Sequence, residues 1–278
     1  MLDRARHLLQ TFASGESVAA AAAAPGHAPP ALREIEYGRD ARQKFDVYPA
    51  PEPNGAVIFL VHGGGWEEGD KAKSSLVDHK VAYWRPLGYT LVSTNYRLEP
   101  QAEPFVQAED IARAIAFAQG EARAWGADPG RFVLMGHSAG AHLVALLNAS
   151  SDIARAAGCR PWIGSVLLDC TIYDVAAVMS DPDHAEAYDA FGSDPVHWKR
   201  TSPLDCLAGA TPPMLLVQST EKGKASQARI FADKARRLGS DATVLEEDLS
   251  HRDIDALLGL PGRYTEDVAA FVERVAQA

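Results

Sequence analysis

The chain has 278 residues, of which 47% are hydrophobic, and its formal net charge is −10 at pH 7. This length is sufficient to bury a large core, and we expect one α/β domain with decorations as readily as two smaller domains. The acidic balance and the lack of a Lys/Arg run argue against nucleic acid or an anionic membrane as a partner, because both would need a basic face. The three cysteines, Cys159, Cys170 and Cys206, are too scattered for a disulfide framework or a zinc site.

The first 30 residues predict a short helix over residues 2–12, followed by a tether. An Ala-rich stretch precedes a Pro-Gly break there, but the early Asp3, the scattered charges and the weakly apolar alanines make a poor signal peptide. No run reaches the roughly 18 apolar residues that a transmembrane helix requires. We therefore expect a soluble, cytoplasmic protein.

From residue 31 onward, short β-rich runs alternate with helical patterns, which is typical of an α/β fold with a mostly parallel sheet. The first two runs alternate charged and aromatic residues and are joined by a short connection, so they predict an antiparallel edge. The later runs are continuously apolar, as buried parallel strands are. The eight predicted strands cover residues 33–38, 45–49, 56–61, 90–95, 131–135, 163–169, 214–219 and 242–247.

Helical segments with apolar positions at three- and four-residue spacing lie between these strands. The segment 171–212 breaks the alternation, because it is too long and too rich in turn residues for one crossover helix. We predict that it is a cap-like insertion in a domain that spans residues 31–278. The predicted helices cover residues 74–86, 106–124, 139–149, 225–238 and 264–277.

The pattern Gly136-x-Ser138-x-Gly140 follows a predicted strand and opens a predicted helix, which is the context of a nucleophile elbow. In such an elbow a strained turn projects the serine hydroxyl above the sheet. The flanking residues must be nearly free of side chain, because strand and helix pass close to each other there. The pattern therefore predicts Ser138 as a nucleophile.

A second motif, "VHGGGWEEGD" at residues 61–70, ends the strand predicted at 56–61. Glycines let the backbone curl so that N–H groups face one point, where they can stabilise the negative oxygen of a tetrahedral intermediate. We assign the oxyanion hole to Gly63, Gly64 and Gly65, with Gly64 favoured, and to the N–H of Ala139. The alternatives are a phosphate loop or a plain turn. The motif lacks the Lys-Ser/Thr of a P-loop and the G-x-G-x-x-G of a dinucleotide site.

A serine needs a base to take its proton, and His251 fits this role best. It lies just past the last predicted strand, where the carboxyl ends of parallel strands gather catalytic groups. It also follows Ser138 in the chain, as the order serine, acid, histidine requires. His62 is expected to hold the shape of the glycine-rich loop, and His137 and His142 are expected to pack or to bond locally.

The orienting acid is predicted to be Glu221, the only acid in the loop after the seventh predicted strand. Asp169 and Asp174, after the sixth strand, are competitors, because some proteins of this fold draw their acid from that position. Asp248 is too close to His251 in sequence to reach the far nitrogen of its ring easily.

Taken together, "HGGGW", "GHSAG", "NYRL" at 95–98, "QAEDIARAI" at 107–115 and "SHRDIDALLGLPG" at 250–262 resemble the α/β-hydrolase superfamily. The resemblance covers about residues 31–278 and is to the HGGG branch, which includes hormone-sensitive-lipase-like carboxylesterases, feruloyl-type esterases and kynurenine formamidases. It implies a Ser-acid-His triad, no cofactor, and ester or amide substrates held under a cap. It also implies a structural ion pair between Arg97 and Asp110. Glu221 departs from the aspartate that most relatives would carry.

Three functions follow as hypotheses: a serine carboxylesterase for short-chain or aryl esters, an amide hydrolase such as an arylformamidase, and an inactive relative that only binds. An intact serine, histidine and glycine hole favour the first two. A small-molecule ester is therefore the expected partner, with the oligomeric state left open and a homodimer as one option. The residues expected to wall an apolar acyl or aryl pocket are Trp66, Tyr188, Phe191 and Trp198.

Overall fold

Eight strands form one sheet in the computed structural model, which describes residues 31–278 except 171, 182–188 and 221–224. The spatial order is β1-β2-β4-β3-β5-β6-β7-β8, with β1 and β2 antiparallel at one edge and the remaining neighbours parallel from β4 onward. The predicted eight-stranded, mostly parallel sheet is confirmed. The strands are β1 (Leu32–Glu36), β2 (Lys44–Tyr48), β3 (Val57–Val61), β4 (Thr90–Thr94), β5 (Phe132–His137), β6 (Gly164–Leu168), β7 (Met214–Ser219) and β8 (Ala242–Glu247).

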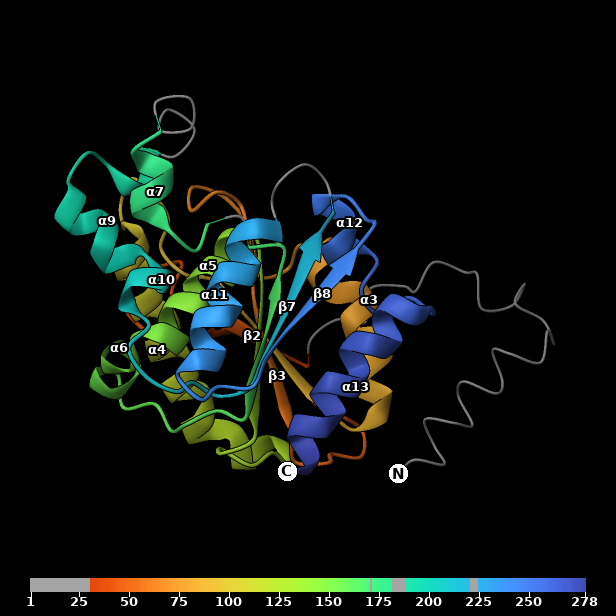
Figure 1. Ribbon diagram of the computed structural model, residues 1–278. Coiled ribbons are helices and arrows are strands. Elements are labelled where there is room, and N and C mark those ends of the chain that lie inside the picture. Colours follow the sequence, from red (N-terminus) through yellow and green to blue (C-terminus); the bar gives the residue numbers. More distant parts are fainter. Residues whose placement is uncertain (1–30, 171, 182–188, 221–224) are drawn as a thin grey trace.

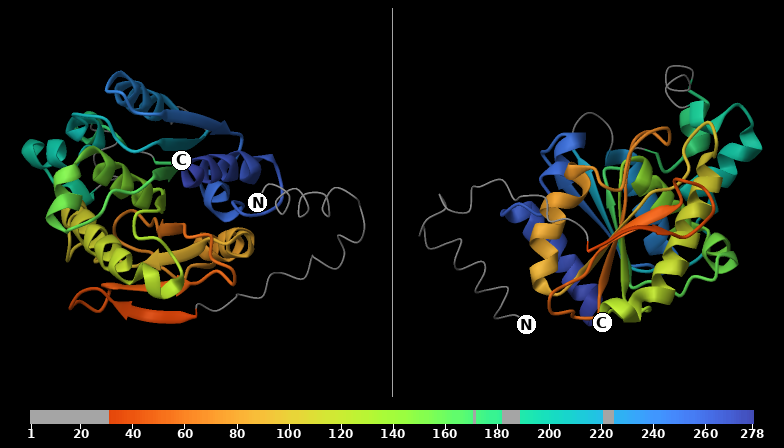
Figure 2. Two further views of the ribbon diagram at one scale, coloured as in Figure 1. Left: turned by 90° about the horizontal axis from the view of Figure 1, so that it is seen from below. Right: turned by 180° about the vertical axis from the view of Figure 1, so that it is seen from behind.

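The helices lie on both faces of this sheet (Figures 1 and 2). All five predicted helices are present within two or three residues of their expected bounds, and the helix predicted over residues 2–12 lies outside the described residues. The α-helices are α3 (Ser74–Trp84), α4 (Pro104–Glu121), α5 (Ala139–Ala149), α6 (Ser151–Ala156), α7 (Val175–Met179), α9 (Pro195–Thr201), α10 (Pro203–Cys206), α11 (Ala225–Arg237), α12 (His251–Ala256) and α13 (Arg263–Gln277).

The core has two layers, one on each side of the sheet. One layer packs α4, α5 and α11 against the sheet, and the other packs α3, α12 and α13 against the opposite face. Every residue of the central strand β3, "VIFLV", is buried, because helices cover both of its faces. The sheet is therefore a rigid platform, and the chain segments that follow its strands are held at one edge.

The described part of segment 171–212 consists of short helices. α7 packs against α9, α9 packs against α10 and α4, and α10 packs against α5. These helices lie together at one side of the molecule (Figure 1). Residues 182–188, and with them Tyr188, lie outside the described residues. The cap role of this segment stays a prediction.

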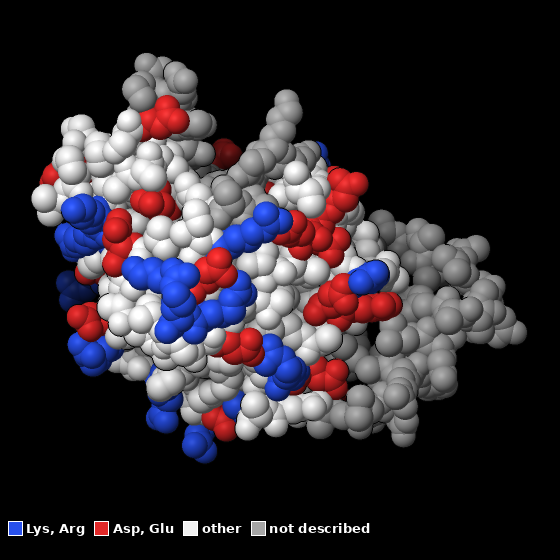
Figure 3. Space-filling model, in the orientation of Figure 1, with Lys and Arg blue, Asp and Glu red and all other residues white. Residues whose placement is uncertain are grey.

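Charged side chains of both signs are interspersed on the face shown in Figure 3. Basic residues end α11, and two of its arginines are paired with acids: Arg229 contacts Glu246, and Arg236 contacts Asp233. Among the described helices, none has both the length and the apolar character needed to cross a membrane.

Candidate active site

Ser138 sits in a strained turn between β5 and α5. Its backbone has φ 55° and ψ −120°, a conformation that residues with a side chain rarely adopt. The elbow geometry predicted from the sequence is thus present.

The two glycines of the motif are required by close packing around this turn. A Cβ atom on Gly136 would lie 2.4 Å from the carbonyl oxygen of Gly140. A Cβ atom on Gly140 would lie 2.4 Å from the carbonyl oxygens of Val61 and His62. Any larger residue would push the elbow away from β3 and from the loop that follows it.

His251 lies beside Ser138, at the first position of α12. Its Nε2 is 3.0 Å from Ser138 Oγ, and its Nδ1 is 2.5 Å from Asp169 Oδ2. The side chain of His251 is 34% exposed, whereas that of Asp169 is fully buried. Serine, histidine and aspartate therefore form one continuous chain of hydrogen bonds, whose acid is buried and whose histidine and serine are partly exposed.

The acid is where the structure corrects the sequence prediction. Asp169, directly after β6, occupies the only N–H that His251 can offer at Nδ1, so the position assigned to Glu221 is taken. Glu221 itself lies outside the described residues. Asp169 was the competing candidate, and its signal in the sequence is an aspartate at the end of the apolar run "SVLLD".

The Asp169 carboxylate is fixed from its other oxygen as well. Oδ1 accepts hydrogen bonds from the side chain of Gln218 at 2.7 Å and from the backbone N–H of Ser219 at 2.9 Å. Both donors come from the end of β7, the neighbouring strand. These bonds leave Oδ2 directed at His251 and favour the charged form of the buried carboxylate.

The loop after β3, residues 62–70, is called the glycine loop below. Gly63 packs directly against the elbow, since a Cβ atom added to it would lie 2.9 Å from Ser138 Cβ. Among the described residues, the backbone N–H groups of Gly63, Gly64 and Gly65 donate no backbone hydrogen bond. Ala139 begins α5, where the first N–H groups have no partner within the helix. Gly63 and Ala139 adjoin Ser138, and Gly64 and Gly65 line the same cavity as Ser138, so the oxyanion assignment of these four residues stays a prediction.

A cavity of about 420 Å³ opens between the glycine loop and α12. It contains Ser138, His251 and all three glycines 63–65. Much of its remaining wall is polar and charged rather than aromatic: Glu67, Glu68, Lys73, His137, Arg252 and Asp255.

The predicted aromatic pocket is wrong for the three residues that the structure describes. Trp66 and Phe191 are almost completely buried and stack edge-to-face at 4.8 Å between ring centroids. Trp198 donates its indole N–H to the carbonyl oxygen of Gly192 at 3.0 Å. None of the three lines the cavity at Ser138. Their role is to pack segment 171–212 against the rest of the domain.

His142 links this aromatic cluster to the nucleophile helix. Its Nδ1 accepts from the Trp66 indole N–H at 3.2 Å, and its Nε2 lies 2.9 Å from the carbonyl oxygen of Thr201. Because Nδ1 must accept and a carbonyl oxygen can only accept, the ring is neutral with its proton on Nε2. The local bonding expected for His142 is confirmed.

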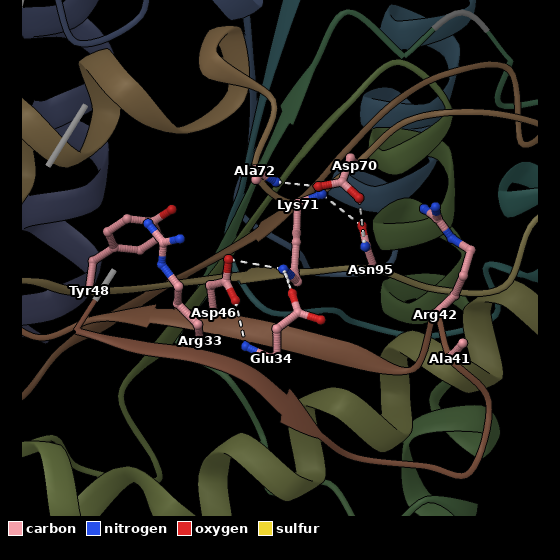
Figure 4. Close-up of a pocket in the computed structure, with 10 residues that line it drawn as sticks. All are labelled: Arg33, Glu34, Ala41, Arg42, Asp46, Tyr48, Asp70, Lys71, Ala72 and Asn95. Carbon is pink, nitrogen blue, oxygen red and sulfur yellow. Dashed lines mark hydrogen bonds and ion pairs between the residues drawn. The ribbon is translucent and has the colours of Figure 1, made fainter. Parts of the chain in front are cut away.

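A cluster of ion pairs and hydrogen bonds holds the chain at the end of the glycine loop. A second cavity, of about 440 Å³, lies beside this cluster (Figure 4). In its wall, Lys71 is paired with both Glu34 and Asp46, and Lys71 Nζ is 3.0 Å from Asp46 Oδ2. Asn95 accepts from the Lys71 N–H at 2.7 Å and donates to Asp70 Oδ2 at 2.9 Å. Since these groups satisfy one another, we interpret this cavity as support for the loop.

The ion pair expected between Arg97 and Asp110 is also present. Arg97 Nε is 2.8 Å from Asp110 Oδ2 and its Nη2 is 2.7 Å from Oδ1, a bidentate arrangement. These bonds keep the pKa of the buried Asp110 carboxyl below its usual range, although burial acts against them. The pair fixes the chain that follows β4.

We expect stability to fall as the pH drops from 6.5 towards 4, because three histidines are buried in the neutral form. Burial lowers the pKa of His62, His137 and His142 to about 4 each. Below pH 6.5 these histidines become protonated in the unfolded chain but stay neutral in the folded chain. Each of them therefore lowers the free energy of unfolding by about 1–2 kcal/mol between pH 6.5 and 5. Urea unfolding at pH 7 and pH 5 measures this loss. Equal free energies of unfolding at the two pH values would contradict the burial of neutral rings.

Comparisons with known proteins agree with this geometry. The family model described as BD-FAE matches residues 45–229. The probable isoprenylcysteine alpha-carbonyl methylesterase ICMEL2 of Arabidopsis thaliana is 36% identical over 113 residues, which are 40% of this chain and 26% of that protein. Esterase LipQ of Mycobacterium tuberculosis is 28% identical over 239 residues, 78% of this chain and 55% of that protein. The chain thus spans between about a quarter and about half the length of these relatives.

A solved structure shares the fold over almost the whole chain. A truncated form of a carbohydrate esterase from gut microbiota superimposes with a TM-score of 0.73 at 18% identity. The superposition covers 89% of this chain and 96% of the other. At this level of identity the likeness supports the architecture alone.

Proposed function

We propose that this protein is a serine esterase that hydrolyses carboxylic esters. The chain belongs to the BD-FAE family, an α/β-hydrolase esterase family. The observation that carries the proposal is the unbroken contact from Asp169 through His251 to Ser138, at 2.5 Å and 3.0 Å. This arrangement supplies a nucleophile, a base and an orienting acid in the order that acyl transfer needs.

In the first half of the reaction, Ser138 Oγ attacks the ester carbonyl carbon while its proton passes to His251 Nε2. Asp169, whose carboxylate accepts a hydrogen bond from the Nδ1–H of His251, stabilises the imidazolium that forms. The tetrahedral intermediate collapses when the bond between carbon and the alcohol oxygen breaks, and His251 returns its proton to the leaving alcohol. An acyl group remains on Ser138.

In the second half, water enters the cavity and gives a proton to His251 as it attacks the acyl carbon. Collapse of the second intermediate breaks the bond to Oγ, returns the proton to Ser138 and releases the carboxylic acid. We assign the stabilisation of the negative oxygen in both intermediates to the N–H groups of Gly63, Gly64 and Ala139, with Gly65 completing the turn of the loop.

The substrate that fits best is a small ester with a short acyl group. The aromatic side chains that could have walled a long acyl chain are packed together away from Ser138, and charged residues line much of the cavity beside it. The acidic composition argues against a nucleic-acid or anionic-membrane partner, and we propose that the protein acts on a small molecule in the cytoplasm.

The test compares initial rates on p-nitrophenyl acetate, p-nitrophenyl octanoate and N-formylkynurenine. We expect kcat/KM to be highest for the acetate ester. Faster turnover of N-formylkynurenine would favour the arylformamidase alternative. No turnover of any of these compounds by folded protein would contradict the esterase proposal.

A further inference from the structure

His137 connects the nucleophile to the base by a second route. It is the last residue of β5 and directly precedes Ser138. Its Nε2 lies 2.9 Å from the backbone carbonyl oxygen of His251. Since a carbonyl oxygen can only accept, His137 donates this hydrogen bond. Residues 137 and 138 on one side and residue 251 on the other are thus held by two bonds, one at the side chain of His251 and one at its backbone.

We propose that His137 is a positioning residue that sets the distance between Ser138 Oγ and His251 Nε2. It does so by holding the backbone from which the catalytic imidazole extends. This inference rests on the proposed function, because it concerns the geometry of the same triad.

The packing around His137 supports this role. Its ring lies 4.7 Å from the ring of His251, centroid to centroid, and its Nδ1 would be 3.3 Å from a Cβ atom on Gly63. The side chain therefore fills the space between the base and the glycine loop. Burial lowers the pKa of His137 to about 4, so at neutral pH it places no second positive charge beside the imidazolium that His251 becomes.

The far end of α12 is anchored from α3, and His137 Nδ1 also lies 4.0 Å from Asp255 Oδ2 there. The Nε2 contact of His137 to the His251 carbonyl oxygen is the one nearest to the reacting atoms. Buried Lys80 on α3 donates to Asp255 Oδ1 at 2.8 Å and to the Asp255 carbonyl oxygen at 2.7 Å. His79, also on α3, contacts the carbonyl oxygen of Ala256 at 2.7 Å. These bonds fix the end of the helix, four and five residues from His251, whereas His137 fixes its first residue.

The experiment compares three variants of His137. His137→Leu keeps a similar volume but removes the donor, and His137→Asn is polar but too short to reach the carbonyl. Each should lower kcat by about 10- to 100-fold, since a displacement of about 1 Å at a reacting group has an effect of that size. KM should change far less. His137→Gln carries an N–H about as far from the backbone as Nε2 does, so it should restore most of kcat.

The rate at which an aryl phosphonate labels Ser138 is a second readout, because His251 must take the same proton in that reaction. It should fall and recover in parallel with kcat. His79→Leu is the matched control, since it removes a histidine contact to a carbonyl of the same helix at a distance from Ser138. We expect it to lower the unfolding temperature while kcat stays near that of the wild type.

Three outcomes overturn the inference. Either His137→Leu and His137→Asn both retain wild-type kcat, or His79→Leu loses as much kcat as they do, or His137→Gln rescues nothing. If the wild-type protein neither turns over an ester nor reacts with the phosphonate, the proposed function fails and the inference falls with it. Wild-type activity with unaffected His137 variants would contradict the inference alone.

Discussion

Replacement of Ser138 by alanine should lower kcat for ester hydrolysis by about 10⁶-fold, the loss expected when the nucleophile of a triad is removed. The fold should survive, because alanine also carries a Cβ atom and adds no strain at φ 55°. The measurement is kcat on p-nitrophenyl acetate together with the thermal unfolding temperature.

Ser180→Ala is the matched control for this substitution. Ser180 lies at the end of α7, and its hydroxyl donates to the carbonyl oxygen of Ala176 at 2.7 Å. Its loss should leave kcat unchanged. Activity near the wild-type level in folded Ser138→Ala protein would contradict a serine nucleophile.

The substitution Asp169→Asn should lower kcat by about 10⁴-fold with a much smaller change in KM. The expected fall in kcat follows from the hydrogen bonds that Asp169 makes. Oδ1 accepts from Gln218 and Ser219, so the amide oxygen of an asparagine would remain there and its NH₂ group would face His251 Nδ1. Nδ1 would then have to accept, which moves the imidazole proton to Nε2. His251 could no longer take the proton of Ser138.

The matched comparison is Glu221→Gln, which removes the other candidate acid. We expect this variant to keep kcat near the wild-type value. The opposite ranking, with Glu221→Gln almost inactive and Asp169→Asn nearly normal, would show that the acid comes from the loop after β7.

Much of the fold could be predicted from the sequence because local pattern and global packing agree. The apolar runs that form β3 to β7 are continuous, and a parallel strand covered on both faces needs no alternation. Two differences have local causes. β5 continues to His137 because the strand runs into the elbow, and α4 begins at Pro104 because proline suits the first turn of a helix.

Helix α12 was not predicted, although its start carries a recognisable signal. Ser250 accepts from the backbone N–H of Asp253, and the Asp253 carboxylate accepts from the Ser250 hydroxyl. This is a close relative of the capping box, with aspartate at the third position. The helix has only six residues, too few for apolar periodicity to show.

Ser138 and His251 could be predicted because each is marked by a local feature of the chain: a glycine pattern for one, and a place after the last strand for the other. The acid has no such mark, since both Asp169 and Glu221 satisfy the order serine, acid, histidine. Only the three-dimensional contact separates them.

The direction in which the Trp66 side chain points could not be predicted from the sequence either. Its position directly after the three glycines 63–65 favoured the pocket, but its backbone turns at φ 66° and its ring is buried against Phe191 and His142. A sequence pattern places a residue near a site, whereas the turn that it adopts decides which way the side chain points.

The most direct test of the account is covalent labelling with an aryl phosphonate, followed by mass spectrometry of the digested protein. We expect one adduct, on the peptide that contains Ser138, and no adduct in Ser138→Ala protein. Labelling should be slowed strongly in Asp169→Asn protein, because the base is then held in the wrong tautomer. An adduct on another residue, or an unlabelled Ser138 in folded wild-type protein, would contradict the claim that Ser138, His251 and Asp169 form the catalytic centre.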